Sequence, residues 1–268
     1  MRKLKICVAG ATGWAASELC KQMVKTPDME IVSAISRKNA SGNLDSILNL
    51  NTGVNIPVFS TIEEALNISC DVLIDYTSPE IVKHNVLAAL NKGVNVVIGT
   101  SGLSDNDYEN IQKAAEDNNR SVLAVGNFAI SVVLLNKFAE IAANYMNYWE
   151  IIDYASDKKI DSPSGSALEL AYRLSKHGKS KKTVQINNTQ GIKETRGADM
   201  GGTQVHSVRL PGYVISLETI FGMEDEKLIL RHEAGSSAKP YVAGALLAVR
   251  RVNSFTGLRR GLDTVMDF

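Results

Sequence analysis

Near the start of the chain stands Leu4-Lys5-Ile6-Cys7-Val8-Ala9-Gly10-Ala11-Thr12-Gly13-Trp14-Ala15-Ala16, an apolar run that ends in a glycine turn. A Gly-x-x-Gly-x-x-Ala turn that follows a strand and opens a helix lets backbone N–H groups approach a pyrophosphate. The other interpretation is a tight strand-to-helix turn without a ligand. We expect a dinucleotide to bind at this turn, through Gly10, Thr12, Gly13, Trp14 and Ala15.

Beyond the turn, short apolar runs alternate with segments of helical period as far as about residue 127. Parallel strands that are covered by crossover helices produce this alternation. The first half is therefore expected to be α/β, a Rossmann-type parallel sheet domain. Its strands are predicted at residues 4–9, 30–36, 72–75, 94–98 and 121–125, with a surface helix at 105–118.

The pattern changes after residue 127. Apolar helices are predicted at 130–143, 167–176 and 240–252, with a strand at 149–154. Residues 204–210, 214–221 and 227–234 alternate with the period of two that is typical of antiparallel strands. We expect a mixed α+β domain for substrate binding and oligomerisation at 128–239. The dinucleotide-binding domain is then formed by 1–127 together with 240–268.

Composition excludes several classes of protein. Lys+Arg and Asp+Glu are equal at 29 each, so the broad positive field of a nucleic-acid-binding protein is missing. The sequence contains no run of about 18 apolar residues, so no membrane span is predicted. The start of the chain is typical of a strand rather than a signal peptide. The three cysteines lack metal-binding spacing, which indicates core thiols in a reducing compartment. We expect a cytoplasmic protein without nucleic-acid or membrane partners and without a metal site.

The end of the second predicted strand bears on the choice of cofactor. NAD sites usually carry an acidic residue there to bind the ribose 2′-hydroxyl. This chain has Ser36-Arg37-Lys38 instead, two cations and a hydroxyl suited to a 2′-phosphate. We therefore predict that NADPH is preferred and NADH is possible. The alternative is a solvated turn that binds nothing.

Five segments of the chain form a recognisable set: the turn at Gly10, Asp75-Tyr76-Thr77-Ser78-Pro79-Glu80, Ile98-Gly99-Thr100-Ser101-Gly102, Gly126-Asn127-Phe128 and Lys159-Ile160-Asp161-Ser162-Pro163-Ser164-Gly165-Ser166. The last of these is the most specific. Together they resemble the 4-hydroxy-tetrahydrodipicolinate reductase family, also called dihydrodipicolinate reductase, of lysine biosynthesis. The resemblance spans nearly the whole chain and implies a homo-oligomer, a tetramer formed through the open sheet of the second domain.

The resemblance also implies roles for individual residues. Tyr76, Thr77, Gly99, Thr100, Asn127 and Phe128 would bind the cofactor, and Lys159, Ser164, Gly165 and Ser166 a substrate carboxylate. Several of the first group follow predicted strands, where a parallel sheet binds its ligand. A Ser-Gly-Ser turn that begins a helix favours an anion, because its N–H groups are unsatisfied and the helix dipole is positive there. Simple helix capping is the alternative for this turn.

One departure from the family pattern affects the chemistry. Family members carry two adjacent histidines ahead of the lysine, one of them assigned as the proton donor, whereas this chain has Ala155 and Ser156. Neither is a good general acid. Lys159 could supply the proton, or the imine could arrive already protonated from water. Tyr154 is another candidate if a nearby lysine lowers its pKa, and otherwise a core or interface aromatic.

The sequence is compatible with three functions. The favoured one is NAD(P)H-dependent reduction of the C=N bond of a small carboxylate-bearing substrate, as in the family, with Lys159 and Tyr154 as catalytic candidates. The second is reduction of a different imine or a conjugated C=C bond, because Ala155 and Ser156 leave room where imidazoles would stand. The third is a non-catalytic paralogue that binds the nucleotide.

Overall fold

The computed structural model describes residues 2–268. The chain forms two compact units, and its first unit is interrupted by the second. The opening segment of the first unit ends at Ile130, and the unit resumes at Ala238 and continues to Phe268. The second unit is Ser131–Ser237.

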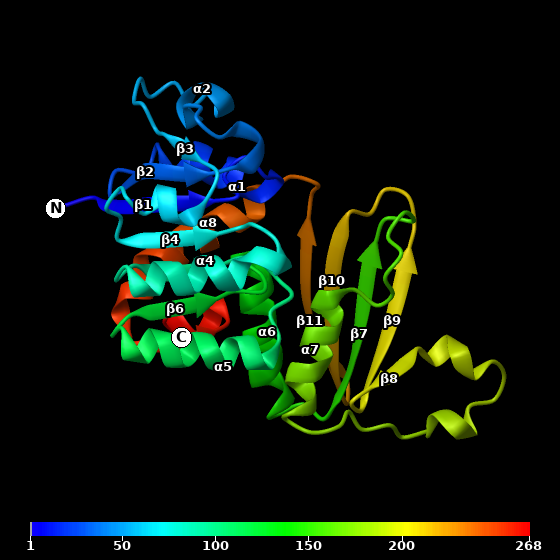
Figure 1. Cartoon of the computed structure of the whole chain (residues 1–268). Helices are drawn as coiled ribbons and strands as arrows, with labels where there is room; N and C mark the ends of the chain where they lie inside the picture. The colour runs from blue at the N-terminus through cyan, green and yellow to red at the C-terminus, as the bar shows by residue number, and fades with distance from the viewer. Residues whose placement is uncertain (1) are drawn as a thin grey trace. The chain divides into compact units, whose positions relative to one another are not determined.

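The first unit is built on a seven-stranded sheet whose hydrogen-bonded pairs are all parallel (Figure 1). Its strand order is β12-β6-β5-β4-β1-β2-β3. The strands are β1 (Leu4–Ala9), β2 (Met29–Ile35), β3 (Val58–Phe59), β4 (Val72–Asp75), β5 (Asn95–Ile98), β6 (Ser121–Ala124) and β12 (Gly257–Arg260).

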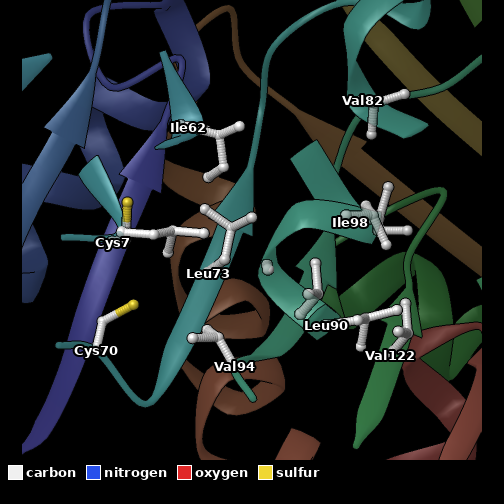
Figure 2. Packing of buried hydrophobic residues seen from close by; sticks show 14 of the residues in the cluster. Cys7, Ile62, Cys70, Leu73, Val82, Leu90, Val94, Ile98 and Val122 are labelled. Atoms are coloured by element: carbon white, nitrogen blue, oxygen red, sulfur yellow. The ribbon is translucent and has the colours of Figure 1, made fainter. Parts of the chain in front are cut away.

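Helices cover both faces of this sheet (Figure 1). The helices of this unit are α1 (Trp14–Met23), α2 (Leu44–Leu48), α3 (Ile62–Ala65), α4 (Pro79–Asn91), α5 (Asp105–Asp117) and α8 (Lys239–Arg251), with 3-10 turns at Arg37–Asn39, Val252–Ser254 and Leu262–Val265. Helices α1 and α8 pack together. Helices α3, α4 and α5 bury apolar side chains against the strands, as Figure 2 shows for Ile62, Val82 and Leu90 beside Leu73 and Ile98. Strands buried on both sides explain the continuous apolar runs of the sequence.

The second unit is a five-stranded sheet in the order β11-β10-β7-β9-β8. Its strands are β7 (Tyr148–Ala155), β8 (Ala198–Met200), β9 (Thr203–Arg209), β10 (Ile215–Met223) and β11 (Glu226–Ala234). Helices α6 (Ile130–Ala143) and α7 (Gly165–Ser175) share one core with β7, β9 and β10. Short 3-10 turns at Ile186–Asn188 and Lys193–Arg196 lie in the long connection to β8.

The predicted fold class is confirmed, a parallel α/β unit followed by a mixed unit, with three corrections of detail. Strand β9 pairs antiparallel with β8 but parallel with β7, so the antiparallel interpretation of 204–210 holds for only one of its two neighbours. Strand β12 was not expected, because Gly257–Arg260 has two arginines and no apolar run. Helix α7 begins at Gly165, two residues before the predicted start, which makes Ser164 its N-cap.

In the part of the chain that the structure describes, no helix is both long and apolar enough to cross a membrane. Among the same residues, no three His, Cys, Asp or Glu side chains are arranged to hold a metal ion. The three cysteines are buried and free.

Candidate active site

A cavity of about 600 Å³ lies in the first unit at the carboxyl ends of β1, β2 and β4. Of the residues that the sequence predicted for the cofactor, eight line it: Gly10, Thr12, Gly13, Ser36, Arg37, Lys38, Tyr76 and Thr77. Nine others were not foreseen: Ile35, Ser60, Thr61, Ile62, Glu63, Ser78, Ile81, His84 and Asn85. Ser78 lies in the segment 75–80 that carries the family resemblance, and most of the others come from the polar segment around α3 and from the first turns of α4, to which the sequence assigned no role.

Two glycines make room for Tyr76 beside this cavity. Gly10 has φ +74°, and a Cβ there would lie 2.3 Å from the Tyr76 carbonyl oxygen. A Cβ on Gly99 would lie 2.4 Å from the Tyr76 ring, which also packs against the ring of Phe128 at 5.6 Å between centroids. Any larger residue at either glycine would push Tyr76 away. The glycine turn and the ends of β4 and β5 are thus packed into one block.

The segment after β2 presents two cations to the cavity. Ser36 is held by a hydrogen bond between its Oγ and Oγ1 of Thr12, at 2.8 Å. Arg37 and Lys38 follow in a 3-10 turn, and the salt bridges found among residues 2–268 involve neither of them. The pKa of Glu80 is lowered chiefly by a hydrogen bond from Ser78 and, to a smaller extent, by the charge of Arg37. Both cations are available to an anionic ligand.

The remaining predicted cofactor residues lie around this block rather than in the cavity lining. Trp14 and Ala15 begin α1, and Trp14 is 62% exposed with its ring edge-on to Tyr241 at 5.9 Å. Asn127 accepts a hydrogen bond from the backbone N–H of Ala129 at 2.9 Å.

In the second unit, Lys159 stands in a loop between β7 and α7. Its Nζ forms an ion pair with Asp161 at 2.8 Å, and its backbone N–H donates to the Ser156 carbonyl at 3.0 Å. The ion pair lowers the pKa of Asp161. Both side chains remain partly exposed, so an anionic ligand can compete with Asp161 for the ammonium group.

The N-terminus of α7 follows in the same loop. Ser164 caps the helix by accepting a hydrogen bond from Ala167 N–H at 3.3 Å. The first N–H groups of a helix have no partner within the helix, and the dipole makes this end positive. Gly165 and Ser166 are the first two residues of α7 and supply such groups, which favour an anion.

Asp153 and Arg209, for which the sequence predicted no role, hold this loop in place. Asp153 of β7 is almost completely buried and accepts hydrogen bonds from both Ser164 and Arg209. Arg209 of β9 also donates to the Asp161 carbonyl at 2.9 Å. A sequence signal existed for Asp153, since it occupies an inward-facing position between buried Ile151 and Ala155, where a charge needs a partner.

The structure separates Tyr154 from these groups. Its neighbour Asp153 faces Ser164, and successive side chains of a strand point to opposite faces. The Tyr154 ring stacks on Tyr213 at 5.1 Å and lies 4.9 Å from the guanidinium carbon of Arg231. Burial raises the pKa of Tyr154, and no lysine among residues 2–268 acts on it, so the condition under which Tyr154 was a candidate proton donor is not met within this chain. Within this chain Tyr154 is an aromatic of the sheet face opposite α7.

Comparisons with known proteins agree over both units. Residues 4–128 match the family model for the N-terminus of dihydrodipicolinate reductase, and residues 131–266 match that for its C-terminus. The 4-hydroxy-tetrahydrodipicolinate reductase of Bacillus pumilus (strain SAFR-032) is 36% identical over 265 residues, 98% of each chain. That of Bacillus cytotoxicus (strain DSM 22905 / CIP 110041 / 391-98 / NVH 391-98) is 31% identical over 268 residues, 100% of each chain.

Solved structures are also similar to this chain over nearly its whole length. A dipicolinate-bound dihydrodipicolinate reductase from Paenisporosarcina sp. TG-14 superposes with a TM-score of 0.89 at 30% identity, covering 98% of this chain and 100% of that chain. An amine dehydrogenase from Mycobacterium smegmatis has a TM-score of 0.70 at 14% identity, covering 98% of this chain and 96% of that chain, and shares the fold.

Proposed function

Because the chain belongs to the dihydrodipicolinate reductase family, an oxidoreductase family that reduces an imine with NAD(P)H, we propose that it reduces 4-hydroxy-tetrahydrodipicolinate with NADPH. The observation that carries the proposal is the presence of both half-sites, the glycine-turn cavity of the first unit and the Lys159 loop of the second. We assign dinucleotide binding to residues 1–127 with 240–268, and substrate binding and oligomerisation to residues 128–239.

The residues of the first unit fit a phosphorylated dinucleotide. Gly10 keeps the backbone of the turn free of a side chain, and Thr12 with Gly13 lines the cavity that runs on to Arg37 and Lys38. In the proposed complex the N–H groups at the start of α1 bind the pyrophosphate, while Ser36, Arg37 and Lys38 bind the 2′-phosphate. The cofactor supplies the hydride. Tyr76, Thr77, Gly99, Thr100, Asn127 and Phe128 are assigned to its nicotinamide end, with Trp14 and Ala15 at the helix start.

The second unit would hold the substrate through its carboxylates. Lys159 and the N–H groups of Gly165 and Ser166 are assigned to one carboxylate, in line with the dipicolinate bound to the related reductase. Reduction of a C=N bond also requires a proton on nitrogen. With Ala155 and Ser156 where the family pattern has histidines, Lys159 is the general acid we propose in this chain. Water that protonates the imine before hydride transfer is the alternative source.

The proposal also includes an oligomeric state and a cellular location. The face of the second sheet opposite α6 and α7 carries charged and aromatic groups, among them the ion pair of Glu150 with His206 and the stacked Tyr154 and Tyr213. We assign this face to a homotetramer, as the family resemblance implies. The three buried free cysteines are in keeping with a cytoplasmic enzyme.

The experiment that tests the function is NADPH oxidation by the purified protein, supplied with the fresh product of the preceding lysine-pathway enzyme. NADPH and NADH are titrated in parallel. Turnover that depends on both the substrate and Lys159 is the expected result. Tight NADPH binding without turnover would contradict the assigned substrate, and would favour a different imine or a conjugated acid that fits beside Ala155 and Ser156. Failure to bind either nucleotide would contradict the whole proposal.

A further inference from the structure

A completely buried carboxylate, that of Asp75, stands behind the cofactor cavity at the end of β4. One oxygen, Oδ1, accepts three hydrogen bonds: from Thr77 N–H at 2.9 Å, from Thr77 Oγ1 at 2.6 Å and from Thr100 Oγ1 at 2.8 Å. The other oxygen, Oδ2, accepts one from the Asn85 side-chain amide at 2.8 Å. Every one of these donors belongs to the first unit.

These four hydrogen bonds connect three chain segments. Thr77 belongs to the turn between β4 and α4, Thr100 follows β5, and Asn85 is buried in α4. The backbone of Asp75 adds a fifth connection, because its carbonyl accepts from Gly99 N–H at 2.8 Å. A single side chain therefore sets how the turns after two neighbouring strands lie relative to each other.

The chemistry of the donors explains why a carboxylate is needed. A hydroxyl can rotate to another acceptor, but the Thr77 N–H and the Asn85 amide can only donate. A carboxylate offers several acceptor positions on two oxygens, which an apolar residue of the same size cannot do. Burial makes each unmet donor costly, so the arrangement is held tightly.

We propose that Asp75 is a positioning residue for the nicotinamide half of the cofactor, acting through Thr77 and Thr100. The inference rests on the proposed function, in which those two threonines and Gly99 surround the nicotinamide end. Asp75 itself is completely buried, and it is not among the residues that line the cavity. The adenosine half is assigned to Arg37 and Lys38, on the other side of β1, and should not depend on Asp75.

The test compares two ligands that share the adenosine half. NADPH reaches both halves of the proposed site, whereas 2′-phospho-ADP-ribose lacks the nicotinamide. Asn85→Asp removes the donor to Oδ2 of Asp75 and sets a second carboxylate against that oxygen, and the repulsion should displace the Asp75 side chain from its present position. By calorimetry we expect the affinity for NADPH to fall at least tenfold more than the affinity for 2′-phospho-ADP-ribose, which is the fair comparison because Asn85 itself also lines the cavity.

Rescue and control variants make the result specific. In Asp75→Asn with Asn85→Asp, the new amide faces the new carboxylate and its oxygen still accepts from Thr77 and Thr100, so NADPH affinity should return to within threefold of wild type. Asn95→Asp makes the same exchange at the start of β5, where Asn95 bonds Asn253 and Ser121, and should change neither affinity. Asn85→Ala replaces Asn85→Asp if the latter does not fold, with an expected NADPH loss of threefold or more.

Three results would overturn the inference: equal weakening of both ligands, unchanged NADPH binding in the Asn85 variants, or no rescue by the exchanged pair. A wild-type protein that binds neither ligand would instead overturn the proposed function, and the inference with it. Wild-type binding of both ligands separates the two failures.

Discussion

Asp153 accepts two hydrogen bonds from Ser164, one from its backbone N–H at 2.8 Å and one from its hydroxyl at 2.7 Å. The first ties the backbone just ahead of α7 to the centre of the second sheet, and the second orients the N-cap. Arg209 balances the charge of the same carboxylate at 2.7 Å. The loop that carries Lys159 is therefore anchored at its far end by a buried ion pair.

Asp153→Asn should uncouple this loop from the sheet. An amide nitrogen at the position of Oδ2 would face two donors, Ser164 N–H and Arg209, and would leave the guanidinium unpaired. We expect a loss of about 3 kcal/mol in the free energy of unfolding, measured by urea denaturation, and a rise in the KM for the imine substrate. The control is Glu140→Gln, which weakens another arginine pair of this unit and should leave that KM unchanged. An unaltered KM in Asp153→Asn would contradict the anchoring role.

Lys159→Ala should remove both the cation of the substrate site and the proposed general acid. We expect kcat/KM for the imine to fall by about 10²- to 10⁴-fold, with the affinity for NADPH intact. The matched control is Lys158→Ala. Lys158 is an exposed neighbour, and it is its backbone N–H, not its side chain, that donates a hydrogen bond to Ser156 Oγ. Steady-state kinetics with both variants checks this, and normal turnover by Lys159→Ala would show that the anion site is wrongly assigned.

Joint replacement of Arg37 and Lys38 by Ala should change cofactor preference. Each cation is expected to contact the 2′-phosphate, so NADPH binding should weaken by roughly 10- to 100-fold, as for the loss of one or two charge-assisted hydrogen bonds. NADH lacks that phosphate and serves as the control within the same protein. Titration of both nucleotides decides the point, since an equal loss for the two would refute a 2′-phosphate site.

The three thiols should be unreactive in the folded protein. Burial raises the pKa of the Cys7 and Cys20 thiols to about 12, and burial also raises that of Cys70 to about 11. Only the thiolate reacts, so at pH 8 a disulfide reagent should modify Cys70 at least about 100-fold, and Cys7 and Cys20 at least about 1000-fold, more slowly than free cysteine. In guanidinium all three should react at once. Rapid modification of the native protein would contradict the packing of the first unit.

His232 should make the second unit less stable in mild acid. It is buried, its Nδ1 is hydrogen-bonded to Ser131 at 2.9 Å, and burial lowers its pKa. The unfolded chain then binds more protons than the folded one as pH falls below about 6.5, so stability must rise with pH in that window. One linked proton limits the slope to about 1.4 kcal/mol per pH unit.

The comparison for His232 is His232→Asn, which retains an acceptor for Ser131 but cannot titrate. Urea denaturation of both proteins between pH 5 and 7.5 should show the stability difference between wild type and variant shrinking as the pH falls. A difference that is constant with pH would mean that His232 does not titrate differently in the two states.

Most of the first unit could be predicted from local sequence patterns. The glycine turn, the buried strands around it and the caps of α5 depend on residues within a few positions of each other, so their backbone geometry is specified locally. Strand β12 escaped prediction because pairing with β6, more than 130 positions earlier, is what makes Gly257–Arg260 extended. The direction of β9 escaped it because a period of two reports which face a side chain occupies, and not whether the neighbouring strand runs parallel.

The sequence by itself determined which residues could bind phosphate and carboxylate groups, because a helix start after glycine or serine has that property wherever it lies. Only the tertiary structure decided what holds those groups still. Asp75 meets Thr100 across 25 positions, and Asp153 meets Arg209 across 56. A buried carboxylate must find its donors wherever folding places them, and its partners therefore cannot be read from spacing along the chain.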